Sequence, residues 1–146
     1  MGYGNELRRD DGVGPAVARV IAGYGLPGVV AQTYHQLLPE HAAAIAAADL
    51  VIFVDASLGG ALSVRQVHPS SVPPFCGHQF DPCHLLLLCD RMGSRVPEAW
   101  FIHIPGADFS LGEGLSPAAI RHMQAAVSWV LRIIRNQEHG FTQIKN

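Results

Sequence analysis

Leu50-Val51-Ile52-Phe53-Val54, followed at once by Asp55, is the stretch that decides the fold. A run of consecutive apolar residues of this length is typical of a strand that is buried on both faces, as in the centre of a parallel sheet. We therefore expect a central strand over residues 50–54. Asp55 then lies at the carboxyl end of that strand, which is where open α/β sheets bind their ligands.

Helices and strands alternate on both sides of this run. We expect helices over 13–22, 39–48, 81–93 and 117–134, and further strands over 29–34, 63–67 and 100–104. Asp81-Pro82 and Ser116-Pro117 each combine a helix N-cap residue with a first-turn proline. Such alternation implies right-handed crossovers and a three-layer α/β/α sandwich with a mostly parallel central sheet.

Length and composition narrow the class of protein. The chain has 146 residues, which fits a single domain over residues 1–146. Apolar residues make up 49% and charged residues 15%, a balance that excludes a disordered chain. The formal charge of −2, with Lys and Arg scattered along the sequence, argues against a nucleic-acid partner. No apolar run approaches the roughly 20 residues of a membrane helix, so we expect no membrane partner.

The cysteines and the N-terminus bear on localisation. Cys76, Cys83 and Cys89 form an odd set in a chain large enough to bury a core, which favours a reducing compartment over a disulfide scaffold. No charged segment followed by a long apolar stretch marks a signal peptide. We therefore expect a cytoplasmic protein.

The beginning of the sequence is unusual. Residues 1–5, Met-Gly-Tyr-Gly-Asn, form a glycine turn of the kind that follows a first β-strand, but no strand precedes it. A lost central strand would remove many backbone hydrogen bonds and much apolar burial. We therefore expect the first strand to be missing or truncated, through a shortened chain or a start assigned too far downstream.

Asp11, Asp55 and His78 form the most informative candidate site. Adjacent strand ends can bring the carboxylates of Asp11 and Asp55 close together, where they repel each other unless a proton or cation lies between them. With the imidazole of His78 they make an O,O,N ligand set that suits nickel or zinc. Ordinary alternatives stay open: a helix N-cap at Asp10 or Asp11, an Asx turn at Asp55, and a loop histidine at position 78.

Three other interpretations compete with this site. Cys76, His78, Cys83 and His84 resemble a zinc site, but adjacent helical residues point about 100° apart and rarely bind one ion together. We expect Cys83 and Cys89 to be small core residues instead. A dinucleotide or phosphate site fails because the third glycine of the fingerprint would fall at Leu7. His103, inside an apolar strand, is expected to be a satisfied core histidine, and the loop around Ser110 is expected to be structural.

Four segments, taken in order, resemble the motifs of the maturation endopeptidases of nickel–iron hydrogenases. They are Gly2-Tyr3-Gly4-Asn5-Glu6-Leu7-Arg8-Arg9-Asp10-Asp11-Gly12-Val13-Gly14, the run 50–56, Gly77-His78-Gln79-Phe80-Asp81-Pro82, and the run 104–116. The similarity extends from Gly2 to about Ile134, nearly the whole chain.

The resemblance implies an enzyme that removes the C-terminal extension of a hydrogenase large-subunit precursor once nickel has been inserted. It assigns metal contact to Asp11, Asp55 and His78, catalysis to Asp11 and Asp55, and substrate binding to Gly4 and Asn5. The nickel would arrive with the precursor, so we expect no permanently bound cofactor. We also expect a monomer that forms a transient complex with the precursor.

The resemblance leaves the mechanism open. The metal in the precursor can serve as the recognition element and polarise the scissile carbonyl or an attacking water. Alternatively, Asp11 or Asp55 serves as general base for water, as in aspartic peptidases. A non-cleaving binding protein for the nickel-loaded precursor would use the same residues.

Overall fold

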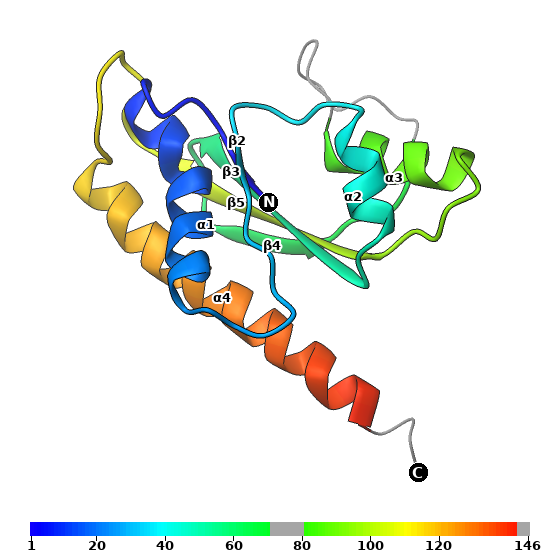
Figure 1. Cartoon of the computed structure of the whole chain (residues 1–146). Helices are drawn as coiled ribbons and strands as arrows, with labels where there is room; N and C mark the ends of the chain where they lie inside the picture. The colour runs from blue at the N-terminus through cyan, green and yellow to red at the C-terminus, as the bar shows by residue number, and fades with distance from the viewer. Residues whose placement is uncertain (71–80, 143–146) are drawn as a thin grey trace.

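A five-stranded sheet organises the chain, with strand order β2-β1-β3-β5-β4 (Figure 1). The computed structural model describes residues 1–70 and 81–142. The strands are β1 (Gly2–Tyr3), β2 (Thr33–Tyr34), β3 (Leu50–Leu58), β4 (Ser63–Gln66) and β5 (Glu98–Gly106). Neighbouring strands are parallel except β4, which runs antiparallel to β5 at one edge. The prediction of a mostly parallel sheet is confirmed.

Helices cover both faces of the sheet (Figure 1). The helices α1 (Val13–Gly23) and α4 (Pro117–Thr142) lie together on one face, and α2 (His41–Ala46) and α3 (Pro82–Arg91) lie on the other. This is the three-layer α/β/α sandwich that the sequence predicts. Within the described ranges, no helix combines the length and the apolar composition that crossing a membrane requires.

Strand β3 shows why its sequence is continuously apolar. Val51 and Phe53 pack into the core beneath α2 and α3, whereas Val54 packs into the core beneath α1 and α4. Ile102 and Ile104 of β5 follow Val54 into that second core and are completely buried. Because helices cover both faces, the run 50–54 places apolar side chains on each side of the sheet.

The expected helix starts are largely confirmed. The Asp81 carboxylate accepts a hydrogen bond from the His84 amide at 2.8 Å, and Ser116 Oγ accepts one from the Ala119 amide at 3.2 Å. These are the N-caps expected for α3 and α4. Several boundaries differ: β2 keeps only the end of the run 29–34, and α2 is shorter than 39–48. The strands β3 and β5 and the helix α4 extend beyond the predicted ranges 50–54, 100–104 and 117–134.

The first strand is present but short. Gly2–Tyr3 pairs in parallel with both β2 and β3, so two residues occupy a central place in the sheet. Met1 adds two bonds to β3, because its amino group donates to the Ile52 carbonyl at 2.7 Å and its carbonyl accepts from the Val54 amide at 3.0 Å. Burial lowers the pKa of this amino group to about 5. The short strand, with Met1 before it, is thus bonded to both of its neighbours.

Helix α1 packs directly on the backbone of β1 and β3. A Cβ atom at Gly14 would lie 2.5 Å from the carbonyl oxygens of both Tyr3 and Val54. A Cβ atom at Gly2 would lie 2.0 Å from the carbonyl oxygen of Gly14. Only glycine permits so close an approach of helix and strands.

We predict that Gly14→Ala lowers the free energy of unfolding by about 2 kcal/mol or more, because the added methyl group must push α1 away from the sheet. Gly23→Ala, at the other end of α1, is the matched control because nothing lies within 4 Å of its Cβ position. We expect this control to be neutral or to stabilise by up to about 1 kcal/mol. Urea denaturation followed by circular dichroism measures both, and equal effects would contradict the close packing.

Candidate active site

Asp11 and Asp55 come together at the carboxyl ends of the parallel strands. Asp55 lies in β3, just beyond the apolar run, and Asp11 lies in the short 3-10 turn η1 (Arg9–Gly12) that leads into α1. Because α1 packs against β1 and β3, it holds η1 over the ends of these strands. The two carboxylates are close enough for the charge of Asp11 to raise the pKa of Asp55. Their catalytic roles stay predictions.

Asp55 has an unusually high pKa. Burial raises it to about 7, and the negative charge of Asp11 acts in the same direction. The Ala56 amide, 2.8 Å from Asp55 Oδ1, and a hydrogen bond from the Tyr3 hydroxyl oppose the shift because they stabilise the charged form. Near neutral pH this carboxyl group therefore exchanges a proton readily, as a general acid or base must.

The turn between β1 and η1 holds Asp11. The Asn5 amide donates a hydrogen bond to Asp11 Oδ2 at 2.8 Å. Gly4 has φ of +144°, and a Cβ atom there would lie 1.9 Å from the Asp11 carbonyl oxygen. The Asn5 side chain accepts from the Leu7 amide at 3.0 Å and stabilises the turn. Gly4 and Asn5 thus shape the site around Asp11, and their contact with substrate stays a prediction.

Asp10, the residue before Asp11, has a different environment. It is fully buried, and its carboxylate accepts four hydrogen bonds: from the amides of Ala107, Asp108 and Ser116 at 2.7, 3.0 and 2.6 Å, and from Ser116 Oγ at 2.7 Å. Burial by itself would raise the pKa of Asp10, but these bonds outweigh it and lower the pKa. Asp10 therefore fastens η1 to the segment 107–116.

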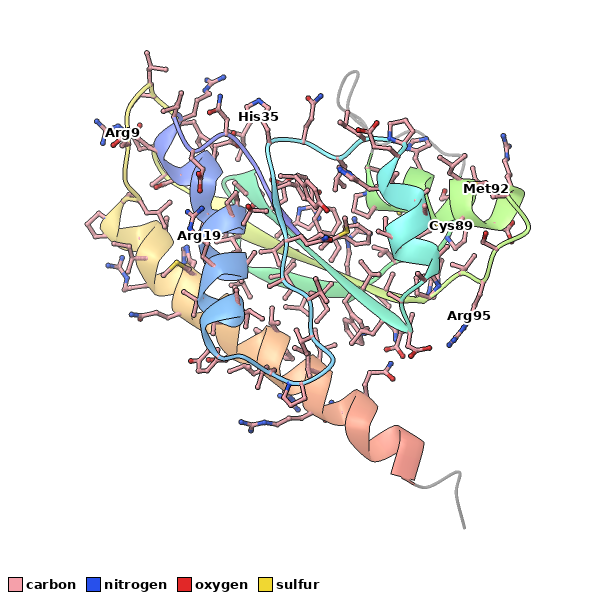
Figure 2. The ribbon with its side chains drawn as sticks, in the orientation of Figure 1. Arg9, Arg19, His35, Cys89, Met92 and Arg95 are labelled. Atoms are coloured by element: carbon pink, nitrogen blue, oxygen red, sulfur yellow. The ribbon has the colours of Figure 1, made fainter. Side chains whose placement is uncertain are left out.

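Arginine side chains strengthen the same junction. Arg9 Nε lies 3.1 Å from Ser110 Oγ and 3.3 Å from Asp108 Oδ2 at the edge of the molecule (Figure 2). Arg8 Nε donates to the Phe109 carbonyl at 3.2 Å. The loop around Ser110 is thus structural, as the sequence predicts.

Two of the ordinary interpretations of these aspartates are wrong. No side-chain hydrogen bond caps η1 or α1, so neither Asp10 nor Asp11 is a helix N-cap. Asp55 lies inside β3 and bonds to the amide of the next residue, Ala56, whereas an Asx turn bonds two residues ahead. The side chains are used for tertiary contacts that local spacing does not reveal.

The third predicted ligand, His78, lies outside the described residues, as does Cys76. Within the described part of the chain, no group of three or more His, Cys, Asp or Glu side chains could hold a metal ion. The carboxylates of Asp11 and Asp55 nevertheless fit one side of a cation site, because a cation would relieve their repulsion.

The described members of the alternative zinc cluster have structural roles. Cys83 packs against the core beneath α2 and α3, as the sequence predicts for a small core residue. His84 Nδ1 lies 2.9 Å from Asp81 Oδ1 at the start of α3. Cys89, also expected in the core, is buried, and its thiol donates to the Ala42 carbonyl at 3.3 Å (Figure 2). These contacts argue against a zinc site at this position.

His103 is the residue that sequence reasoning misjudged. It pairs in register with Asp55 across β5 and β3, so the two side chains lie on the same face of the sheet. Its ring lies on that of Phe101, with centroids 3.8 Å apart, and its Nε2 is buried without a hydrogen-bond partner among the described residues. Burial and the positive charge of Arg65 lower the pKa of His103. The sequence signal that could have identified His103 is that it is a polar residue within an apolar strand.

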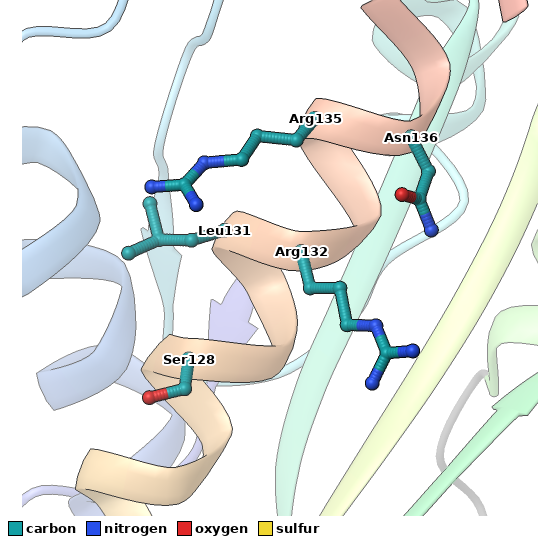
Figure 3. A pocket seen from close by; sticks show the side chains of 5 residues that line it. All are labelled: Ser128, Leu131, Arg132, Arg135 and Asn136. Carbon is teal, nitrogen blue, oxygen red and sulfur yellow. The ribbon is translucent and has the colours of Figure 1, made fainter. Parts of the chain in front are cut away.

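A surface pocket on α4 is separate from this site. It has a volume of about 600 Å³ and is lined by Ser128, Leu131, Arg132, Arg135 and Asn136 (Figure 3). Helix α4 begins beside the site, where Ser116 binds Asp10, and a helix rises about 1.5 Å per residue. At that rise Ser128, the first of the lining residues, lies roughly 18 Å along the helix from Ser116. Its lining residues include no carboxylate.

We predict that Asp10→Ala lowers the free energy of unfolding by about 3 kcal/mol or more, because it leaves three partly buried amides and the Ser116 hydroxyl without their acceptor. Asp49→Ala is the control: its exposed carboxylate pairs with Arg95 at 2.6 Å, and such pairs contribute less than about 1 kcal/mol. Chemical denaturation at neutral pH measures both changes. A loss at Asp10 no larger than that at Asp49 would contradict the anchoring role.

Asp55 also predicts a pH dependence of stability in the metal-free protein. Its pKa is about 7 in the folded state and 3.8 unfolded, so its stabilising contribution is complete below about pH 4 and is lost as pH rises through about 7. Asp55→Asn removes this titration. We expect the melting temperature of the variant to exceed that of the wild type above about pH 7 and to approach it near pH 4. A difference in melting temperature between the variant and the wild type that is the same at every pH would contradict the raised pKa of Asp55.

Solved structures share this fold. The maturating endopeptidase HybD from E. coli has a TM-score of 0.75 at 17% identity, over 93% of this chain and 90% of its own. The NiFe hydrogenase maturation protease HycI from Thermococcus kodakarensis has 0.69 at 22% identity, over 92% and 89%. A hydrogenase 2 maturation peptidase from a Thaumarchaeota archaeon has 0.67 at 23% identity, over 91% and 94%.

The likeness lies in the structure and not in overall sequence. No family model matches the chain, and no curated protein matches it. The structural matches cover about nine tenths of both partners. The chain has the three-layer α/β/α fold of the hydrogenase maturation proteases.

Proposed function

We propose that this protein is an endopeptidase that removes the C-terminal extension of a nickel-loaded NiFe-hydrogenase large-subunit precursor. The observation that carries the proposal is the pair of carboxylates, Asp11 and Asp55, held together at the carboxyl ends of the sheet in a fold shared with such enzymes. The Asn5 and Ala56 amides fix the two carboxylates independently. This order before substrate arrives is what a catalytic site needs.

The nickel of the precursor belongs to the substrate and not to the resting protein. Asp11, Asp55 and His78 would engage it, because two carboxylates and an imidazole make a ligand set that nickel accepts. A precursor without nickel would lack this contact and would be held less firmly. The metal would thereby act as the recognition element that places the scissile bond.

Hydrolysis requires a group that accepts a proton from water. We propose that a carboxylate of the Asp11–Asp55 pair takes this proton while the water oxygen bonds to the peptide carbonyl carbon. The carbon–nitrogen bond then breaks, and the proton passes from the carboxyl group to the departing amine. A pKa of about 7 at Asp55 supports the exchange of a proton in both directions near neutral pH.

We further propose that the protein acts in the cytoplasm, as a monomer that binds its precursor transiently. Cys83 and Cys89, the cysteines among the described residues, are free thiols, which suits a reducing compartment.

The test is intact mass spectrometry of a nickel-loaded precursor incubated with this protein, beside a nickel-free sample. We expect a discrete C-terminal peptide to be lost in the nickel-loaded sample alone. Asp55→Asn should reduce cleavage at least about 1000-fold, because general-base catalysis and metal contact are lost together. Asp49→Asn, an exposed aspartate paired with Arg95, should cleave like the wild type.

The outcomes separate the candidate functions. An Asp55→Asn variant that cleaves normally would remove that residue from the mechanism. A wild-type protein that is folded and binds the nickel-loaded precursor without cutting it would favour the non-cleaving binding role.

A further inference from the structure

Tyr3 is a buried tyrosine directly beside the candidate site. Its side chain is 7% exposed and belongs to the core beneath α2 and α3. Its ring centroid lies 6.4 Å from that of Phe101 on β5. A phenol hydroxyl buried among apolar side chains needs a hydrogen-bond partner. The nearest candidate is the carboxylate of Asp55 on the neighbouring strand, whose negative charge contributes to raising the pKa of Tyr3.

The sheet register explains why Tyr3 reaches Asp55. Gly2 of β1 pairs with Val54 of β3, so the next residue on each strand, Tyr3 and Asp55, follows on the opposite face. That face is the one covered by α2 and α3, because Tyr3 and Phe53 both pack into that core. Phenylalanine at position 3 would fill the same space without supplying a donor.

Two groups lie beside the Asp55 carboxylate. The Ala56 amide donates to Oδ1 at 2.8 Å, and the Tyr3 hydroxyl, on the neighbouring strand, lowers the pKa of Asp55 as a donor does. With the hydrogen bond from the Ala56 amide alone, the carboxylate can still rotate about the axis of that hydrogen bond. A second donor, attached to a ring packed in the core, removes that freedom.

We propose that Tyr3 is a positioning residue, whose hydroxyl holds the Asp55 carboxylate in the orientation that the reaction at the Asp11–Asp55 pair requires. Its effect on catalysis rests on the proposed function, whereas the contact with Asp55 does not. The residues 3–5 then organise both carboxylates: Tyr3 holds Asp55, Gly4 permits the close approach, and the Asn5 amide holds Asp11.

Tyr3→Phe tests the proposal because it removes one oxygen atom and keeps the ring in the core. On nickel-loaded precursor, we expect kcat to fall about 10- to 100-fold, as for other residues that orient a reacting group, while KM changes less than about 2-fold. A merely structural loss would instead reduce the amount of active protein and leave kcat per folded molecule unchanged.

Tyr34→Phe is the matched control. Tyr34 lies in the neighbouring strand β2 and is partly buried. Its ring packs at a tilt against that of His41, with 4.1 Å between the centroids. We expect both kcat and KM of this variant to stay within about 2-fold of the wild type. Equal kcat values for Tyr3→Phe and the wild type would overturn the positioning role.

A second measurement decides the contact itself without requiring activity. Melting temperatures are compared for the wild type, Tyr3→Phe, Asp55→Ala and the double variant. We expect Tyr3→Phe to lower the melting temperature of the wild type by a few degrees and to leave that of Asp55→Ala unchanged or higher, because the acceptor is already absent. Equal shifts in both backgrounds would overturn the contact.

Together, the two measurements distinguish a failure of the proposed peptidase function from a failure of the positioning role of Tyr3. A wild type that does not cleave the precursor, together with non-additive melting temperatures, would reject the proposed peptidase while the Tyr3–Asp55 contact stands. A wild type that cleaves, together with additive melting temperatures and an unchanged kcat in Tyr3→Phe, would retain the peptidase and reject the positioning role.

Discussion

Backbone contact between helix α1 and the strands β1 and β3 is the constraint on which the rest of the structure depends. Gly14 allows the helix to lie against the carbonyl groups of Tyr3 and Val54 without an intervening side chain. With α1 held so close, the turn η1 that precedes it must cross the ends of the strands. Asp11 is thereby brought close enough to Asp55 for its charge to raise the pKa of Asp55, although the two residues lie far apart in the sequence.

The adjacent aspartates in η1 have different roles because they differ in burial and in the number of hydrogen-bond donors around them. Asp10 faces inward and has donors for both carboxylate oxygens, so it remains charged while completely buried. Asp11 has one backbone donor and stays partly exposed, which leaves it able to bind a ligand. The fully satisfied carboxylate provides the anchor, and the partly satisfied one is available for the proposed chemistry.

Asp55 reduces the stability of the folded chain locally. A carboxyl group that is largely buried beside a second carboxylate is less favourable than an amide in the same place, because repulsion and desolvation both oppose its charged form. The Ala56 amide and the Tyr3 hydroxyl offset part of this effect. Sites that break local rules in this way are those in which function is commonly found. His103, whose Nε2 has no partner among the described residues, lies in register with Asp55 and adds to the polarity of this face.

The sequence by itself determined the architecture. Local patterns in the sequence are enough to predict it, because they do not depend on contacts with distant residues. These patterns are the apolar run 50–54, the capped helix starts at Asp81 and Ser116, and the alternation of helices and strands. The same local signals also indicated that Asp11 and Asp55 lie near strand ends. They did not distinguish Asp10 from Asp11, since both satisfy the pattern of an N-cap.

Tertiary structure decided what each polar side chain does. The donors of Asp10 come from the segment 107–116, the tyrosine hydroxyl beside Asp55 comes from β1, and His103 meets Asp55 only through sheet register. It also decided how the short strand β1 is held, because both neighbouring strands and Met1 contribute bonds at this place. Hydrogen bonds between residues distant in sequence have no local periodicity, so only the folded chain reveals them.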